Sequence, residues 1–169
     1  MKISLHKAEM KDCVEIHEMQ RASFRSLLNK YQDAATNPGA ESLEEIERKM
    51  AHEFTDYYFI SLGNEHIGVI RVVRLQDHVC RISPMFILPE YQGNGYAQQA
   101  ITEVESVYPQ TCRWELDTIK QEAKLCHLYE KMGYQATGKE TMLQRDMTII
   151  FYEKSMISEK GWDTIASDP

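Results

Sequence analysis

The sequence predicts an α+β protein of the mixed α/β kind, in which about four helices flank a mixed, mostly antiparallel sheet of about seven strands. Two observations predict this class. Some segments carry apolar residues at helical spacing, and others are β-branched or aromatic runs typical of strands. Their order is strand, two helices, three strands, helix, strand, helix and two strands. An antiparallel meander followed by βαβ-like units fits one sheet with helices on its faces.

Composition and length favour a single globular domain. The chain has 169 residues, of which 43% are hydrophobic and 27% charged, close to globular averages. We expect the domain to span residues 1–154. Residues 155–169 lack periodicity and include Trp162, so we expect a tail or a short docked appendage there.

The charge balance and the cysteines narrow the function classes. The net charge of −7 lacks the basic footprint of a nucleic-acid-binding protein and mildly favours a cationic ligand. The cysteine spacings match no zinc pattern, so we expect no metal and read Cys13, Cys80, Cys112 and Cys126 as reduced thiols of a cytoplasmic protein. Residues 1–12 lack the apolar core of a signal peptide, and the longest apolar runs are far below the ~20 residues needed to span a bilayer. We therefore expect no membrane partner.

The first third of the chain predicts a strand, two helices and a loop. A short strand is expected over residues 2–5. Asp12 and Glu15 have the spacing of a capping box, which predicts a helix from there to about Lys30. Residues 31–40 contain Asn-Pro-Gly and are typical of a loop. Ser42 and Glu45 form a second capping box, and the helix after it has apolar positions at Leu43, Ile46 and Met50.

The remaining elements follow from alternation, helical spacing and turn residues. Strands are expected at residues 57–62, 67–75, 79–88, 113–118, 135–143 and 147–154. Helices are expected at residues 94–107 and 121–132, the first stopped by Pro109 and the second followed by Gly133 as its C′ residue. Pro84 lies inside an expected strand and predicts a bulge or an edge position, because proline cannot donate to a ladder.

Residues 86–103 are the most informative segment for chemistry. They comprise the end of a strand, a polar turn with Gly93 and Gly95, and an amphipathic helix. Glycines allow positive φ angles and a close approach of backbone to ligand. The unpaired amides and the dipole of the following helix start then suit a phosphate or pyrophosphate. The turn lacks both the Walker A and the G-x-G-x-x-G patterns, so a tight connection without a ligand remains an equal alternative on these residues alone.

Three motifs together resemble the GNAT N-acetyltransferase superfamily. Residues 92–97 (Gln-Gly-Asn-Gly-Tyr-Ala) are similar to its Q/R-x-x-G-x-G/A acyl-CoA motif, and Ile87-x-Pro89-x-Tyr91 is similar to the V-x-P-x-Y lead-in. Residues 128–134 (Leu-Tyr-Glu-Lys-Met-Gly-Tyr) are similar to the L-Y-E-K-x-G-F segment. The resemblance covers about residues 2–154. It implies a GNAT-like fold and acetyl transfer from acetyl-CoA to a primary amine, either a small amine or a protein N-terminus or lysine, by a monomer or homodimer.

The resemblance also implies the donor site. In such proteins the amides of the glycine-rich turn hold the CoA pyrophosphate, and the bulged strand before it pairs with the pantetheine arm. One amide facing the thioester oxygen would act as an oxyanion donor, an effect worth ~3–4 kcal/mol in comparable sites. The implied acetyl-CoA-binding residues are Met85, Phe86, Ile87, Gln92, Gly93, Asn94, Gly95, Tyr96, Ala97 and Gln98.

Two residues carry the implied catalytic roles. Tyr129 stands where the family places its general acid, although it also shares the apolar face of its helix and could serve only packing. Asp117 stands where ribosomal-protein N-terminal acetyltransferases of this family carry a base carboxylate. Glu115 lies on the same strand face, so Asp117, Glu115 or a water without a side-chain base are all open, as is a merely solvated face.

Departures from the family pattern leave other questions open. Many members carry an Asn where this chain has Glu122 and an Ala where it has Leu125, so the corresponding CoA contact is not carried over. If the first loop folds over the acceptor site, we expect four residues to border that site: Tyr31, Asp33, Tyr57 and Tyr58. The alternative functions are a non-catalytic acyl-CoA sensor of the same fold and a nucleotide-phosphate protein of another class.

Overall fold

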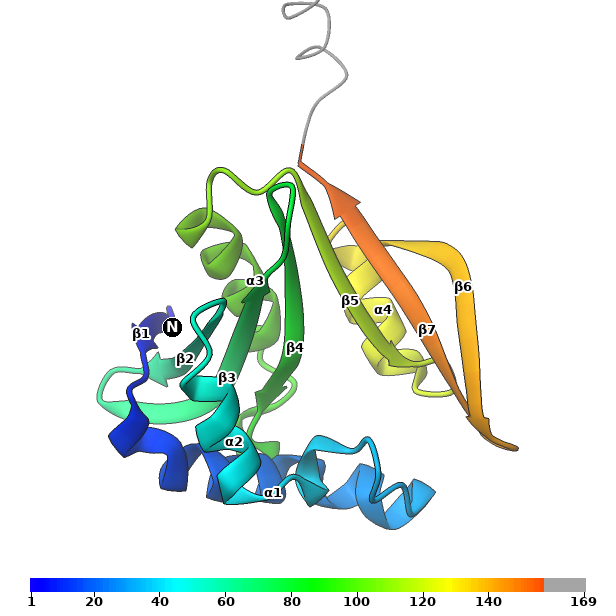
Figure 1. Ribbon diagram of the computed structural model, residues 1–169, viewed down its shortest axis with the longest axis horizontal. Coiled ribbons are helices and arrows are strands. Elements are labelled where there is room, and N and C mark those ends of the chain that lie inside the picture. Colours follow the sequence, from blue (N-terminus) through cyan, green and yellow to red (C-terminus); the bar gives the residue numbers. More distant parts are fainter. Residues whose placement is uncertain (157–169) are drawn as a thin grey trace, which may run out of the picture.

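The computed structural model describes residues 1–156 and contains a seven-stranded mixed sheet in the order β1-β2-β3-β4-β5-β7-β6 (Figure 1). Neighbouring strands are antiparallel except for β4 and β5, which are parallel. The strands are β1 (Ser4–Lys7), β2 (Thr55–Leu62), β3 (Glu65–Arg74), β4 (Val79–Ile87), β5 (Arg113–Ile119), β6 (Gln135–Gln144) and β7 (Met147–Ser155). The predicted fold class is confirmed.

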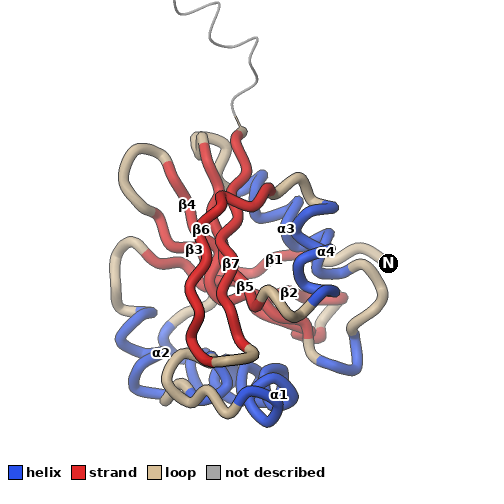
Figure 2. The backbone as a smooth tube through the Cα atoms, turned by 90° about the vertical axis from the view of Figure 1, so that its right-hand side faces the viewer, coloured by secondary structure: helices blue, strands red, loops and turns tan. Residues whose placement is uncertain are grey.

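Four helices cover the two faces of this sheet. They are α1 (Cys13–Tyr31), α2 (Leu43–Met50), α3 (Tyr96–Val107) and α4 (Ala123–Lys131). Helices α1 and α2 lie on one face and α3 and α4 on the other (Figure 2). The central strands are apolar on both faces for this reason: in β2, Phe59 packs with the α1–α2 layer, and its neighbours Tyr58 and Ile60 pack with the α3–α4 layer.

The sheet opens between its two parallel strands. Residues 79–81 of β4 pair with residues 113–115 of β5, and beyond that point the two strands diverge (Figure 1). On its other side, β4 stays paired with β3 but places both Ser83 and Pro84 opposite Arg71 alone. This extra residue is a β-bulge, which bends a strand and disrupts its ladder. The bulge predicted at Pro84 is confirmed, and it lies where the strands part.

Helices α1, α3 and α4 begin differently from the sequence prediction, and α4 (predicted from residue 121) begins at Ala123. Asp12 does not cap α1 with its side chain. Its Oδ2 instead accepts a hydrogen bond from the amide of Glu9 (2.8 Å) and closes the 3₁₀ turn at residues 10–12, which precedes α1. The Ser42 cap is confirmed, because its hydroxyl accepts from the amide of Glu45 (3.1 Å). Helix α3 begins two residues later than predicted, since Gly95 has a left-handed conformation that a helix cannot contain.

Strand β7 runs to Ser155, one residue past the predicted end of the domain. The rest of the predicted tail, including Trp162, lies outside the described residues apart from Met156. None of the helices within residues 1–156 is long and apolar enough to cross a bilayer.

Candidate functional site

A cavity of about 750 Å³ lies where β4 and β5 diverge, and we call it the chamber. Its walls come from both layers of the fold. One side is formed by the glycine-rich turn, the start of α3 and helix α4, and the other by α1, the loop before α2 and the β6–β7 hairpin. The gap in the sheet therefore joins a site on the α3–α4 face to a site on the α1–α2 face.

The glycine-rich turn presents a row of free amides. Gly93 and Gly95 both have a φ of +81°, which lets the chain fold back before α3. Within the described residues, no amide from 93 to 98 donates a hydrogen bond. Two side chains hold the turn instead: Gln92 Nε2 donates to the carbonyl of Ile87 (2.8 Å), and Asn94 Nδ2 donates to that of Tyr91 (3.1 Å). Six unpaired amides at a helix start form a cradle for an anion.

The segment of β4 beyond the bulge borders the chamber with an open edge. Met85, Phe86 and Ile87 all line the cavity. They pair with β3 on one side, whereas on the other side β5 has already turned away. In an antiparallel ladder alternate residues point their backbone groups to opposite sides, so part of this backbone faces the gap and can hydrogen-bond an amide-containing arm lying there, while the carbonyl of Ile87 accepts from Gln92. Most of the predicted donor residues line the same cavity; Asn94 does not, and its side chain supports the turn.

Tyr129 and Asp117 reach the chamber from opposite layers. Tyr129 lies on α4 and is buried, with its ring packed against Tyr134 and Tyr152 at centroid distances of 6.3 Å. Asp117 lies on β5, on the face away from the buried Trp114 and Leu116. Burial raises the pKa of the Tyr129 phenol well above its ordinary value, and the nearby Asp117 carboxylate raises it further. The phenol is therefore protonated throughout the neutral range.

The two candidate base carboxylates have different surroundings. Asp117 lines the chamber and forms an ion pair with Arg81, which comes from the last paired residues of β4. Glu115 accepts hydrogen bonds from Arg113 (3.1 and 3.2 Å) and is not among the residues that line the chamber. The structure thus brings Asp117, but not Glu115, to the same cavity as Tyr129.

Apart from Asp117, sequence reasoning missed the wall opposite the glycine-rich turn. This acceptor wall consists of Ser23, Phe24, Leu27, Thr36, Asn37, Pro38, Asp117, Thr118, Ile119, Thr141, Leu143, Met147, Ile149 and Phe151. The first loop does contribute to it, but through residues 36–38. None of the four residues expected to border the site lines the chamber; those four are Tyr31, Asp33, Tyr57 and Tyr58. The period-two apolar pattern of β7, in Met147, Ile149 and Phe151, is the signal that could have found part of this wall.

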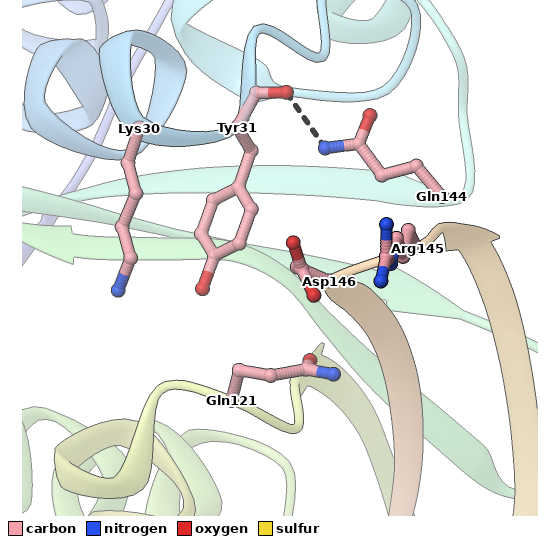
Figure 3. Close-up of a pocket in the computed structure, with 6 residues that line it drawn as sticks. All are labelled: Lys30, Tyr31, Gln121, Gln144, Arg145 and Asp146. Atoms are coloured by element: carbon pink, nitrogen blue, oxygen red, sulfur yellow. Dashed lines mark hydrogen bonds between the residues drawn. The ribbon is translucent and has the colours of Figure 1, made fainter.

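A second, smaller pocket of about 460 Å³ lies behind the acceptor wall (Figure 3). Tyr31 separates the two, because it lines this pocket and packs with Ile119 and Met147 of the acceptor wall. Its hydroxyl donates to Glu122 Oε2 (2.6 Å), which also accepts from Lys30 Nζ (2.7 Å). Burial by itself would raise the pKa of the Glu122 carboxyl, but these two hydrogen bonds lower it overall. Glu122 therefore ties the end of α1 to the start of α4.

A mixed sheet that splits beside a glycine-rich helix start, with free amides leading into a chamber, forms a site suited to an anion that carries an extended arm. The model of the Acetyltransferase (GNAT) family matches residues 14–134, and the chain belongs to this family. The predicted resemblance is thereby confirmed. The predicted enzyme class and donor, an acetyl-CoA-dependent N-acetyltransferase, are confirmed at the level of the family. Within residues 1–156, no group of three or more potential metal ligands occurs.

Several solved structures share the fold at low sequence identity. Spermidine N-acetyltransferase from Vibrio cholerae in complex with CoA and spermine has a TM-score of 0.72 and 18% identity, over 91% of this chain and 95% of that chain. The ribosomal-protein-S18-alanine N-acetyltransferase from Escherichia coli has a TM-score of 0.72 and 12% identity, over 93% of this chain and 97% of that chain. AAC(6')-Ib in complex with ribostamycin and CoA has a TM-score of 0.71 and 14% identity, over 100% of both chains. No curated protein matches the sequence significantly.

Proposed function

We propose that this protein transfers an acetyl group from acetyl-CoA directly to a primary amine held against the acceptor wall. The observation that carries the proposal is the single chamber that runs from the six free amides of residues 93–98 through the gap in the sheet to that wall. The structurally similar enzymes support it, because their names give varied amines as acceptors, including spermidine and a ribosomal-protein alanine.

The donor would lie along the open edge of β4. The free amides of residues 93–98 bind the CoA pyrophosphate at the positive end of α3. The pantetheine amides pair with the backbone of residues 85–87, as a neighbouring strand would. One amide of this edge then donates to the thioester oxygen and stabilises the negative charge that develops there in the transition state.

The chemistry needs one neutral amine and two proton transfers. The amine nitrogen attacks the thioester carbonyl carbon, so that a C–N bond forms and the C–S bond breaks. Tyr129 donates its phenolic proton to the departing CoA sulfur, and the nitrogen loses its extra proton to Asp117 or to a water beside it. An α-amine, with a pKa of about 7.7–8.0, reaches the neutral form more readily than a lysine-type amine near 10.4.

Calorimetric titration with acetyl-CoA tests the donor site without thiol reagents, which the four cysteines would confuse. We expect micromolar binding to the wild type and at least ~10-fold weaker binding to Gly95→Asp. The new carboxylate would occupy the position of a phosphate and repel its negative charge. Gly63→Asp is the matched control. It also introduces an aspartate at a positive φ (+55°) with open space around it, but in the β2–β3 turn. Equal loss in both variants, or no binding to the wild type, would contradict the proposal.

Product detection by mass spectrometry then separates the enzyme from a sensor. Acetylated amine that depends on both acetyl-CoA and protein supports the transferase. Tight acetyl-CoA binding with no acetylated product from any amine would favour a non-catalytic acyl-CoA sensor.

The proposal also includes the cellular location and the oligomeric state of the protein. The four cysteines are free thiols, which supports a reducing, cytoplasmic location. A monomer or a homodimer is proposed, and light scattering of the purified protein distinguishes them.

A further inference from the structure

The acceptor wall carries little charge. The chain has 26 acidic residues, yet Asp117 is the only charged residue of the acceptor wall among the described residues. The rest of the wall is apolar or uncharged, with aromatic and branched side chains such as Phe24, Ile149 and Phe151. The negative charge of the whole chain is therefore not concentrated on the acceptor wall.

The single carboxylate is already compensated. Asp117 forms an ion pair with the guanidinium of Arg81, and both side chains are about two-thirds or more buried, with 27% and 33% exposed. A carboxylate held this way can accept one further hydrogen bond from an amine. It offers no uncompensated negative charge for a second ammonium group.

The rim adds a positive charge. In β6 the ladder with β7 is interrupted between Ala136 and Glu140, where Gly138 has a φ of +90°. Next to this glycine, Lys139 places its ammonium 4.4 Å from the centroid of the Phe151 ring. Phe151 belongs to the acceptor wall, whereas Lys139 does not line the chamber, so this cation placed beside the wall would repel a polycation.

We propose that the acceptor is a primary amine with a single positive charge, carried by an apolar or aromatic body. The inference rests on the proposed function and names the substrate class of the same chamber. Polyamines and amino sugars would bury several ammonium groups without partners, which is strongly unfavourable. An apolar body instead gains from burial against the acceptor wall.

The same surroundings help the chemistry. Removing an ammonium from water into an apolar site disfavours its charged form, so the amine loses its proton more easily there. The apolar wall thus favours the neutral amine and reduces the need for a strong side-chain base. The ion-paired Asp117 needs only to receive the proton or to orient a water that receives it. Net, one amine and one acetyl-CoA yield one amide and one free CoA thiol.

A competition assay tests the proposal. Phenethylamine, hexylamine, spermidine and kanamycin are offered with acetyl-CoA at pH 8, and the products are quantified by mass spectrometry. We expect kcat/KM for the two monoamines to exceed that for spermidine and kanamycin by at least ~10-fold, the size of discrimination that an apolar pocket provides. A short peptide with an N-terminal Phe, compared with phenethylamine, distinguishes a protein source of the apolar amine from a small-molecule source.

A matched pair of variants tests the physical cause. Thr141→Glu adds a second carboxylate to the acceptor wall, whereas Met142→Glu adds the same charge at the next residue, which is 71% exposed and does not line the chamber. We expect Thr141→Glu to narrow the preference for phenethylamine over spermidine several-fold, and Met142→Glu to leave it unchanged. Equal effects of the two variants would overturn the proposed cause.

The outcomes separate this inference from the function on which it rests. Turnover with spermidine or kanamycin equal to or above that of the monoamines would overturn the inference and leave the acetyltransferase intact. Acetyl-CoA binding with no acetylation of any amine would overturn the proposed function, and the inference with it.

Discussion

At the scale of single residues, Tyr129 combines a packing role with a place in the chamber. Its ring belongs to the core with Tyr134 and Tyr152, which fixes the position of its hydroxyl. The same burial raises the pKa of its phenol, so that the phenol is a weak acid that stays protonated throughout the neutral pH range. Both readings of Tyr129 that the sequence left open, core packing and a site role, are therefore compatible with one side chain.

Replacing Tyr129 with Phe should separate these two roles. We expect Tyr129→Phe to keep the ring packing and acetyl-CoA binding but to lower kcat by about 10²–10⁴, the usual contribution of a general acid. Steady-state kinetics and calorimetry measure the two quantities. Unchanged kcat would show that water or the solvent protonates the thiolate instead.

The pH profile gives a second check at this residue. Ionisation of the phenol would remove the acid, and its raised pKa moves that ionisation above the ordinary value near 10. We therefore expect no loss of wild-type kcat between pH 8 and pH 10 from this group. A fall in kcat with a midpoint below pH 10, present in the wild type and absent in Tyr129→Phe, would contradict this assignment.

At the scale of elements, Glu122 joins two helices that are far apart in the sequence. It accepts from Tyr31 and Lys30 at the end of α1. From the β6–β7 hairpin, Gln144 Nε2 donates to the carbonyl of Tyr31 (2.7 Å), as Figure 3 shows. The residue that departs from the family pattern thus supports the back of the acceptor wall. We infer a structural role for it in place of a contact with CoA.

Removing this carboxylate should cost stability. In Glu122→Ala the partly buried hydroxyl of Tyr31 loses its acceptor, and we expect a decrease of about 1 kcal/mol in the free energy of unfolding. Glu122→Gln is the control, because its amide oxygen can still accept from Tyr31. Urea denaturation measures both, and equal losses would show that the charge, and not the hydrogen bond to Tyr31, is what matters.

What the sequence could predict depended on how local each signal is. The glycine-rich turn is encoded in a few consecutive residues, so Gly93, Gly95 and the helix after them could be predicted together. The acceptor wall is assembled from α1, a loop and two late strands, and no local pattern says that these segments meet. The Asp12 cap was wrong for a related reason, since the same side chain can cap a turn on either side of it.

At the scale of the whole molecule, buried tyrosines make stability depend on alkaline pH. Burial raises the pKa of five of them above the value of about 10 expected in the unfolded chain; they are Tyr57, Tyr108, Tyr129, Tyr134 and Tyr152. Above pH 10 the unfolded chain therefore binds fewer protons than the folded one. By linkage, the free energy of unfolding then falls as pH rises, by up to about 1.4 kcal/mol per pH unit for each tyrosine.

Urea denaturation at pH 8.0, 9.5 and 10.5 measures this dependence. The five tyrosines should change the free energy of unfolding little between pH 8.0 and 9.5, and should lower it clearly at pH 10.5. The variant Tyr57→Phe should lose less between pH 9.5 and 10.5 than the wild type, because one fewer phenol titrates on unfolding. Identical slopes for the two proteins would contradict the burial argument at this position.

The divergence of β4 and β5 gives this sheet two interior edges in addition to the outer ones on β1 and β6. Unpaired strand edges are the places where proteins capture foreign strands and aggregate. Here the two edges face each other across a wedge, under the cover of α1 on one face and α4 on the other (Figure 1). The empty protein therefore keeps those amides of the diverging part of β4 that point into the wedge open to exchange with solvent deuterium, and a donor lying in the wedge should slow that exchange more than exchange anywhere else in the sheet.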